Sequence, residues 1–256
     1  MNRKQASLVA GLGAVIFIAL PAHATVTLYD QDFENPAAFV NDGGDVNIRN
    51  PVNALYGNQP PGFNFAQANT VETLLITGSQ AFGHGYSDPS GKGGNYALGM
   101  LSSFQNDFLG LSFNVGSNPF MNVRLDISSI DLSVFSGPFV TPGAVPTFEF
   151  TLYDNPGGLA GLGTGNILDV LQATGTASAQ DVFDWTEVSL PLDTTGNTNG
   201  NVTLRIDLLD GGYAALDNFH ITADVSPIPE PEIYAMFLAG LGLMGFMARR
   251  HKREQA

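Results

Sequence analysis

Short segments in which apolar and polar residues alternate recur along most of this 256-residue chain, and they constrain its fold more than any other feature. Residues 202–208 read Val-Thr-Leu-Arg-Ile-Asp-Leu, and residues 123–127 follow the same two-residue period. Side chains of a β-strand point alternately to its two faces, so this period marks strands with one buried and one hydrated face. The chain therefore predicts an all-β fold.

Strand-like patterns are separated by turn-forming clusters of Gly, Asn, Asp and Pro, such as those at 42–45 and 210–212. The predicted strands are 26–33, 46–49, 71–77, 96–100, 108–115, 122–127, 130–135, 147–153, 167–172, 185–190, 201–209 and 215–223. Short strands at this spacing favour a double-sheet sandwich of the jelly-roll type. No repeat of fixed period is present, which argues against a propeller or a β-helix.

Charge and cysteine content narrow the function classes. Residues 25–229 hold only four basic side chains, Arg49, Lys92, Arg124 and Arg205, against 21 Asp and Glu, a net charge of −17. Nucleic acid binding requires clustered cations, so nucleic acid is excluded as a partner. The chain has no cysteine, which excludes disulfides, thiolate metal sites and a cysteine nucleophile. Acidic oxygens could instead supply ligands to Ca²⁺.

The first 24 residues have the pattern of a secretory signal peptide. Arg3 and Lys4 precede an apolar run over 8–20, and Ala22 and Ala24 occupy the two positions expected before a signal-peptidase cut. We expect signal peptidase to cleave after Ala24. The alternative is a retained membrane anchor, which the 13-residue run is too short to form comfortably.

The C-terminal 32 residues divide into three parts of different chemistry. A proline-dense stretch at 225–232 predicts an extended linker after a β-domain at 25–224. An uncharged segment at 233–248 predicts a helix of about 24 Å. A basic tail at 249–256 favours the cytoplasmic side of a membrane that this helix would cross. The alternative is a buried core helix.

These three parts resemble the PEP-CTERM sorting signal of Gram-negative bacteria over residues 227–253. The resemblance rests on Pro229, Glu230 and Pro231, the Gly-rich apolar helix and the basic end with Arg249 and Arg250. It implies processing near the Pro-Glu-Pro motif by an exosortase-like enzyme. It also implies a precursor tethered to the cytoplasmic membrane, and then a place at the cell surface or in the biofilm and exopolysaccharide matrix.

The two ends of the predicted β-domain carry a second resemblance. Residues 29–34 read Tyr-Asp-Gln-Asp-Phe-Glu, and residues 215–221 read Ala-Leu-Asp-Asn-Phe-His-Ile. These ends look like those of jelly-roll modules of the MAM and carbohydrate-binding type, in which the first and last strands are neighbours. The resemblance implies a structural Ca²⁺ held by Glu34 and Asp217, with Asp42 or Asp45 as a third ligand. The alternative is that these acids are ordinary solvated strand residues.

Aromatic side chains offer a candidate ligand-binding surface, because exposed rings can stack on the faces of sugars. Trp185 is the single tryptophan, and the loop over residues 82–88 combines His84 and Tyr86 with Gly, Ser and Asp. We predict these three residues to bind a ligand. The alternative for each ring is packing in the core, which is the usual place of Phe in particular.

No catalytic signature accompanies these features. The chain lacks a Gly-x-Ser-x-Gly elbow and a His-Glu-x-x-His motif. We therefore expect a non-catalytic, exported envelope or biofilm-matrix protein that acts in adhesion or matrix assembly. The alternative is a calcium-dependent carbohydrate-binding module for exopolysaccharide, and a secreted hydrolase is a third reading.

Overall fold

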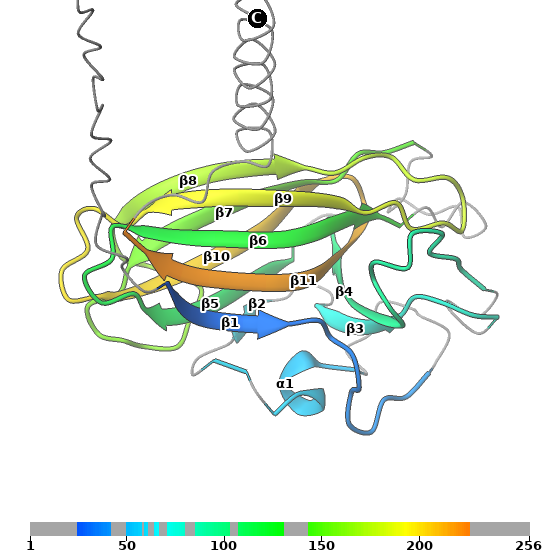
Figure 1. Ribbon diagram of the computed structural model, residues 1–256, viewed down its shortest axis with the longest axis horizontal. Helices are drawn as coiled ribbons and strands as arrows, with labels where there is room; N and C mark the ends of the chain where they lie inside the picture. Colours follow the sequence, from blue (N-terminus) through cyan, green and yellow to red (C-terminus); the bar gives the residue numbers. More distant parts are fainter. Residues whose placement is uncertain are drawn as a thin grey trace, which may run out of the picture.

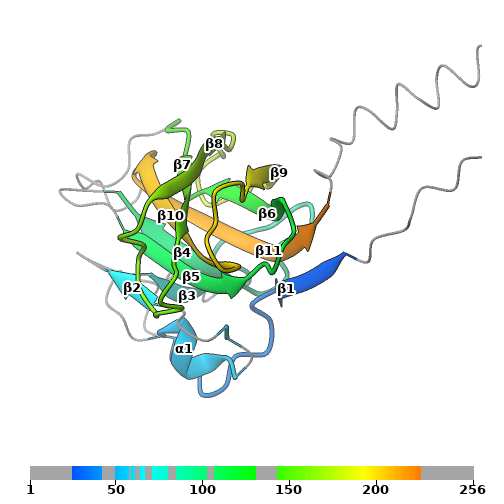
Figure 2. The same cartoon turned by 90° about the vertical axis from the view of Figure 1, so that its left-hand side faces the viewer.

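Two antiparallel β-sheets stacked face to face form the body of the protein (Figures 1 and 2). The computed structural model describes residues 25–41, 50–57, 59–60, 64–66, 71–79, 85–102, 107–130 and 143–225. The sandwich confirms the predicted all-β double-sheet fold.

Sheet A has six strands, in the order β3-β4-β11-β6-β9, with β1 also paired to β11. They are β1 (Val26–Gln31), β3 (Glu72–Leu75), β4 (Tyr96–Leu101), β6 (Phe120–Ser129), β9 (Thr186–Asp193) and β11 (Tyr213–Asp224). The first and last strands are therefore neighbours, as the resemblance at the two ends of the domain implied. In Figure 1 they lie side by side as the blue and orange arrows.

Sheet B has five strands, in the order β2-β5-β10-β7-β8. They are β2 (Asn64–Ala66), β5 (Phe108–Asn114), β7 (Thr147–Asp154), β8 (Ile167–Thr174) and β10 (Asn201–Asp210). One short helix, α1 (Val52–Leu55), precedes β2.

The main hydrophobic core fills the space between the sheets. Val123 and Leu125 of β6 face it from sheet A, and Leu204 and Ile206 of β10 face it from sheet B. These residues come from the two segments with the clearest alternation. The polar residues between them, Arg205 among them, consequently point to the outer faces of the sandwich.

A second buried cluster lies on the outer face of sheet A, at one end. Ala97, Leu101 and Ala215 belong to it, whereas their neighbours along β4 and β11 belong to the main core. Phe183 and Trp185, from the segment before β9, also belong to this cluster, with ring centroids 5.5 Å apart and planes 12° apart. This end of sheet A is therefore buried on both faces.

The predicted strands agree with the structure where they fall on described residues, with two kinds of exception. The prediction missed β2 and α1, both of which are too short to show a period. Residue 130, at the start of the predicted strand 130–135, lies outside any strand, and the rest of that segment falls outside the described residues, as does 46–49.

Candidate functional site

Strand β11 changes one of its neighbours half-way along its length. On one edge, residues 213–216 pair with β4 and residues 219–223 pair with β1, while β6 pairs along the other edge. Asp217 and Asn218 lie between these two stretches, where the register with β6 shifts. Asn218 has a φ of 51°, a left-handed conformation that Asn tolerates better than most residues. The end of β1 and the loop before β4 therefore meet at this irregularity.

Three carboxylates lie side by side across sheet A at this point. Asp126 of β6 stands opposite Asp217 of β11 on one side and opposite Glu187 of β9 on the other. We call Asp217, Asp126 and Glu187 the acid row. Like charges directly opposite each other destabilise a sheet, so the row requires compensation.

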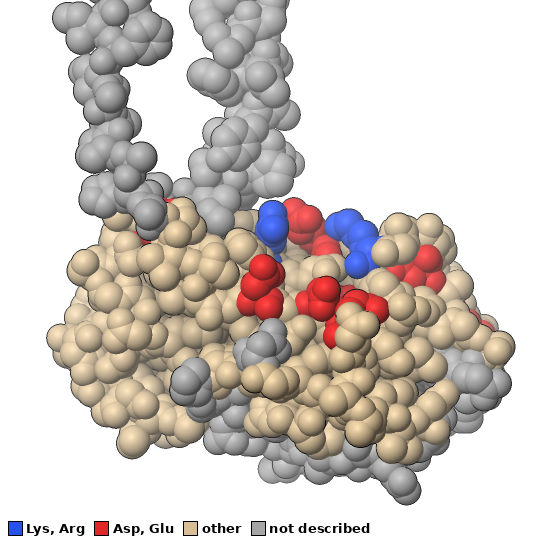
Figure 3. Space-filling model, turned by 60° about the horizontal axis from the view of Figure 1, so that its bottom comes forward, with Lys and Arg blue, Asp and Glu red and all other residues tan. Residues whose placement is uncertain are grey.

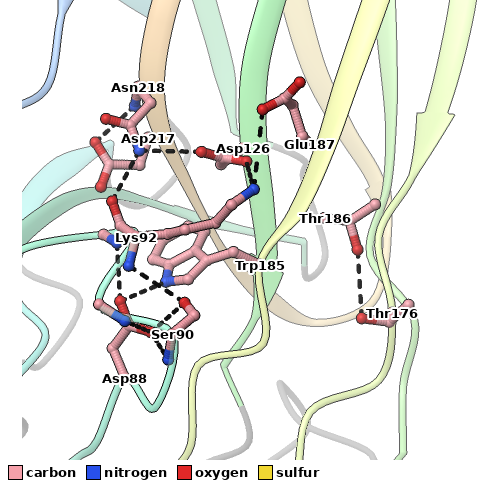
Figure 4. Close-up of polar contacts among 12 residues, drawn as sticks. Asp88, Ser90, Lys92, Asp126, Thr176, Trp185, Thr186, Glu187, Asp217 and Asn218 are labelled. Carbon is pink, nitrogen blue, oxygen red and sulfur yellow. Dashed lines mark hydrogen bonds and ion pairs between the residues drawn. The ribbon is translucent and has the colours of Figure 1, made fainter. Parts of the chain in front are cut away.

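Lys92 reaches the acid row from the loop before β4 (Figure 4). Its Nζ lies 3.1 Å from Asp126 Oδ1 and 3.9 Å from Glu187 Oε2. Asn218 Nδ2 donates to Asp126 Oδ2 at 3.0 Å and to the backbone carbonyl of Lys92 at 2.9 Å. Both oxygens of Asp126 therefore have a donor. Figure 3 shows basic and acidic side chains gathered in one band of the molecular surface.

Glu34, just after β1, holds the other end of the same loop. Its Oε1 accepts hydrogen bonds from the backbone N–H groups of Asn95 and Tyr96 at 2.6 and 2.9 Å. Its Oε2 accepts a bond from Asn95 Nδ2 at 3.1 Å. A Cβ at Gly94 would lie 2.5 Å from Glu34 Oε1, so this approach requires glycine. Glu34 thus fixes the loop to the N-terminal strand.

Asp217 is a buried carboxyl, and only one of its oxygens accepts a hydrogen bond from the described residues. The residue is 1% exposed, and its Oδ1 accepts a 2.7 Å bond from the Asn218 N–H. Its Oδ2 has no hydrogen-bond partner in the part of the chain that the structure describes. Burial raises the pKa of Asp217 to about 9; the Asn218 bond opposes this, and the charges of Asp126, Glu34 and Asp32 add to it. With no cation bound, the carboxyl holds a proton at neutral pH.

The structure brings together only two of the predicted calcium ligands, Glu34 and Asp217. Among the described residues, no three His, Asp or Glu side chains converge so as to hold a metal ion. Calcium accepts about six to eight oxygens, and backbone carbonyls and water can provide several of them. Of the Glu34 and Asp217 oxygens, only Asp217 Oδ2 has no hydrogen-bond partner within the described residues, whereas both oxygens of Glu34 already accept hydrogen bonds, so calcium binding by these two residues stays a prediction. The other two predicted ligands, Asp42 and Asp45, lie outside the described residues.

Asp88 organises the loop that carries Lys92. Its Oδ1 accepts bonds from the Ser90 N–H and Oγ and from the Gly91 N–H, at 2.6 to 3.0 Å. Its Oδ2 accepts bonds from the Gly93 N–H at 2.8 Å and from Trp185 Nε1 at 3.0 Å. Burial by itself would raise the pKa of Asp88, but these hydrogen bonds outweigh it and hold the pKa below its usual value. Asp88 therefore fixes the loop and the Trp185 indole to each other.

The structure places the predicted aromatic ligand-binding residues away from open surface. Trp185 is 8% exposed and Tyr86 is 5% exposed, and both pack against Phe183 in the second cluster. A Cβ at Gly93 would lie 2.4 Å from Trp185 Cζ2, so the loop closes directly over the indole. Sugar stacking on either ring stays a prediction, and their burial counts against it. His84 lies outside the described residues.

Sheet B carries a group of aromatic and polar side chains on its outer face that the sequence reasoning missed. The Arg205 guanidinium carbon lies 5.5 Å from the ring centroid of Phe108 and 5.2 Å from that of Tyr153. At these distances the positive charge of Arg205 is attracted to the faces of both rings. Arg205 Nε is buried and, within the described residues, has no hydrogen-bond partner.

Glu149 and Gln172 continue this face toward the edge strand β8. Glu149 Oε2 accepts a 3.1 Å bond from Gln172 Nε2. Val170 and Ile167 of β8 are 42% and 58% exposed. We call the surface formed by Phe108, Glu149, Tyr153, Gln172 and Arg205 the sheet B face. It combines hydrogen-bonding groups with apolar surface, as recognition of a polyhydroxylated ligand requires.

The connection between β7 and β8 lies against part of the sheet B face. Ser112 Oγ donates to the Leu159 carbonyl at 3.1 Å. A Cβ at Gly110 would lie 2.3 Å from the Gly161 carbonyl oxygen, so β5 needs glycine under this connection. The pattern of alternation showed that Arg205 points outward, but it could not show which strands lie beside it.

The predicted sorting residues Pro229, Glu230, Pro231, Arg249 and Arg250 lie outside the described residues, as does the predicted helix 233–248. Within the part of the chain that the structure describes, no helix is long and apolar enough to cross a membrane.

Residues 227–253 match the family model for the PEP-CTERM protein-sorting motif. The chain carries a PEP-CTERM sorting signal. This signal indicates a protein that is exported and sorted, and it confirms the resemblance given by the sequence.

No curated protein is significantly similar in sequence to this chain. Solved structures with a similar fold include a tandem CBM22 domain of Xyn10C from Paenibacillus barcinonensis, at 14% identity, with a TM-score of 0.43 and coverage of 83% of this chain and 49% of that one. Another is the K3 cleaved adhesin domain of Lys-gingipain from Porphyromonas gingivalis, at 10% identity, with a TM-score of 0.41 and coverage of 77% and 100%. A third, TmCBM61 in complex with β-1,4-galactotriose, has 11% identity, a TM-score of 0.38 and coverage of 65% and 91%. Similarity at this level carries no information on a ligand of this chain.

Proposed function

We propose that this chain is an exported cell-envelope or biofilm-matrix protein of a Gram-negative bacterium, with a non-catalytic role in adhesion or matrix assembly. Its precursor is held at the cytoplasmic membrane through residues 233–248. An exosortase-like enzyme then processes it near Pro229-Glu230-Pro231 and releases the β-sandwich to the cell surface or matrix.

The observation that carries this proposal is the position of the sorting motif relative to the sandwich. Strand β11 ends at Asp224, and the matched motif begins at residue 227. Thr25 Oγ1 donates to Asp224 Oδ2 at 2.6 Å, so the two ends of the sandwich are joined before the motif starts. Cleavage near residues 229–231 would therefore leave every strand of the body in place.

Replacing Pro229, Glu230 and Pro231 together by alanine tests the sorting step in the native host. We expect a longer product that stays in the membrane fraction, because the processing enzyme no longer recognises its substrate. Arg205→Ala in the body is a matched control that leaves the motif intact and is expected to be sorted as in the wild type. Unchanged release and unchanged mass of the triple variant would refute the proposal.

A second candidate function is calcium-dependent binding of an exopolysaccharide, and the sheet B face favours it. Arg205, Glu149 and Gln172 offer donors and acceptors for sugar hydroxyls, and the exposed Val170 offers apolar surface beside them. The calcium ion would be held by Glu34 and Asp217, and it would replace the proton of the buried Asp217 carboxyl. The ion would join β1 to β11 in sheet A, whereas the ligand would bind to the sheet B face. The ion would therefore affect the stability of the sandwich and would not contact the ligand.

Glycan-array binding of the purified full-length chain tests this second candidate. We expect Arg205→Ala and Glu149→Gln to abolish binding, and EDTA to weaken it by destabilising the sandwich. Thr147→Ala, on the same strand as Glu149, serves as the control. Binding that is indifferent to both sheet B variants would remove the sheet B face as the ligand site. Turnover of a polysaccharide by the chain would instead support the third reading, a secreted hydrolase.

A further inference from the structure

Strand β8 is the open edge of the sandwich with the fewest protecting features. Short length, charge and proline are the usual devices that keep an outermost strand from pairing with another chain. The outermost strands β2 and β3 have only three and four residues, and β9 carries Glu187, Pro191 and Asp193. β1, which among the described strands pairs with β11 alone, carries Asp30. β8 has eight residues, no proline and one charged residue, Asp169.

The side of the sandwich formed by β8 and β9 leaves apolar surface open to solvent. Ile167 and Val170 of β8 are 58% and 42% exposed. Leu168 and Leu171 of β8 and Val188 of β9 pack against the main core but are only partly buried. In Figure 1, β8 and β9 lie together along the upper side of the sandwich, whereas α1 lies on the opposite side. An outermost strand of this kind can accept a further strand.

The neighbourhood of β8 carries little charge. Residues 155–180 contain Asp169 as their single charged side chain, although residues 25–229 hold 21 Asp and Glu against four basic residues. A basic partner would be drawn to the acidic surface elsewhere on the body. A second copy of this chain would be repelled there and meets less repulsion at β8. The charge distribution therefore favours a second copy as the occupant of this edge.

Asp169 defines how much of β8 is available for pairing. Its Oδ1 accepts a 2.8 Å bond from the Val170 N–H, and its Oδ2 accepts a 2.8 Å bond from the Asp193 N–H at the end of β9. The first half of β8 is therefore tied to β9. The second half runs from residue 170 to residue 174, where the strand ends, and its midpoint is Gln172.

We propose that β8 is a self-assembly edge, and that residues 170–174 pair in antiparallel fashion with the same residues of a second copy of this chain. Such pairing is self-complementary about a two-fold axis at Gln172, so it closes into a dimer. It joins the two five-stranded B sheets into one continuous sheet. Both sheet B faces then lie on the same side of that sheet, because the two-fold axis is perpendicular to it. The inference deepens the matrix-assembly role proposed above and rests on it.

Cysteine cross-linking of the full-length chain tests the inference, since the chain has no cysteine of its own. Residues that face each other across antiparallel strands have Cα atoms about 4.5–5.5 Å apart, a separation that a disulfide spans. We expect Gln172→Cys to form a covalent dimer when an added oxidant, copper phenanthroline, takes two electrons from the two thiols. Ser189→Cys, on the open edge strand β9, is the matched control and should stay monomeric.

Sedimentation of the full-length chain measures the same dimer without a covalent bond. Val170→Glu adds a like charge to each copy within the paired segment, so it should weaken the dimer at least about tenfold. Ser189→Glu adds the same charge on β9 and should weaken the dimer by less than about threefold. The wild-type dimer should tighten as the salt concentration rises, because both bodies are acidic. Equal weakening in the two variants would show a general effect of net charge and overturn the inference.

The cross-linking results separate the inference from the function on which it rests. No covalent dimer of Gln172→Cys, or an equal yield from Ser189→Cys, would overturn the inference and leave the sorting proposal intact. Cross-linking of Gln172→Cys to a different protein in the host envelope would assign the edge to another partner and would also overturn it. A chain that cross-links at position 172 but is not processed near Pro229 would instead refute the sorting and support the pairing.

Discussion

Asp217 and Asp126 stand opposite each other on β11 and β6, adjacent strands in the interior of sheet A. Two acids in opposed positions of neighbouring strands repel when both are ionised. Asn218 separates them in part, since its amide donates to Asp126 while its backbone N–H donates to Asp217. The main chain departs from regular pairing at this point, and the loop with Lys92 and the end of β1 both close on it.

Asp217→Asn should have opposite effects on stability and on metal response. The amide takes up no proton on folding, whereas the raised pKa of Asp217 makes the wild type do so at neutral pH, so the free energy of unfolding in EDTA should rise by about 1–3 kcal/mol. The increase in stability that calcium gives the wild type should disappear. Urea unfolding of both proteins, with EDTA and with calcium, measures the two effects. Asp30→Asn, on an exposed position, is the control; a less stable variant that still responds to calcium would contradict the account.

Gly93→Ala should destabilise the sandwich and disturb Trp185. The new Cβ would lie 2.4 Å from Trp185 Cζ2, and both the loop and the indole are held by Asp88. Overpacking of this kind costs about 1–3 kcal/mol. Thermal unfolding and the fluorescence maximum of Trp185 provide the measurement. Gly161→Ala, where a Cβ meets nothing within 4 Å, should be neutral, and an equally neutral Gly93→Ala would show that the loop does not close on the ring.

The contacts of Asp88 should give the loop a dependence on acid pH. The pKa of Asp88 is held below its usual value, so the folded state favours the ionised carboxylate. The stability from this group is therefore present above the usual pKa of Asp, near pH 4, and is lost as the pH falls through the lowered pKa. Asp88→Asn should flatten the change in Trp185 fluorescence across this range. A wild-type profile in the variant would assign the change to another group.

Gly110→Ala should weaken the connection between β7 and β8 without touching the acid row. The added Cβ would lie 2.3 Å from the Gly161 carbonyl oxygen, and this backbone cannot move aside as a side chain can. We expect faster hydrogen exchange over residues 155–165 and an unchanged response to calcium. Faster exchange confined to the loop with Lys92 would show that the sheet B face and the acid row are not independent of each other.

Much of the fold could be predicted from alternation, because a strand with one buried face displays its period directly. Segments 201–209 and 122–127 lie in strands in the structure, and the inward residues of both are core residues. The position of Trp185 could not be predicted this way, because it depends on the loop that folds over the outer face of sheet A. A signal was present, however: residues 97–101 of β4 are apolar on both faces, as a doubly covered strand requires.

Only part of the candidate site could be predicted from the sequence. The resemblance to jelly-roll modules at the two ends of the domain points to Glu34 and Asp217, and the pairing of β1 with β11 brings their segments together. Asp126, Lys92 and Arg205 were missed as site residues. Their neighbours are set by the order and register of strands far apart in the chain, which no local pattern contains.

The intact mass of the mature protein from its native host tests the central claim most directly. We predict a mass that corresponds to a chain beginning at Thr25 and ending near residues 229–231, together with any group attached on processing. A mature protein that retains residues 233–256 would contradict the proposed sorting and release.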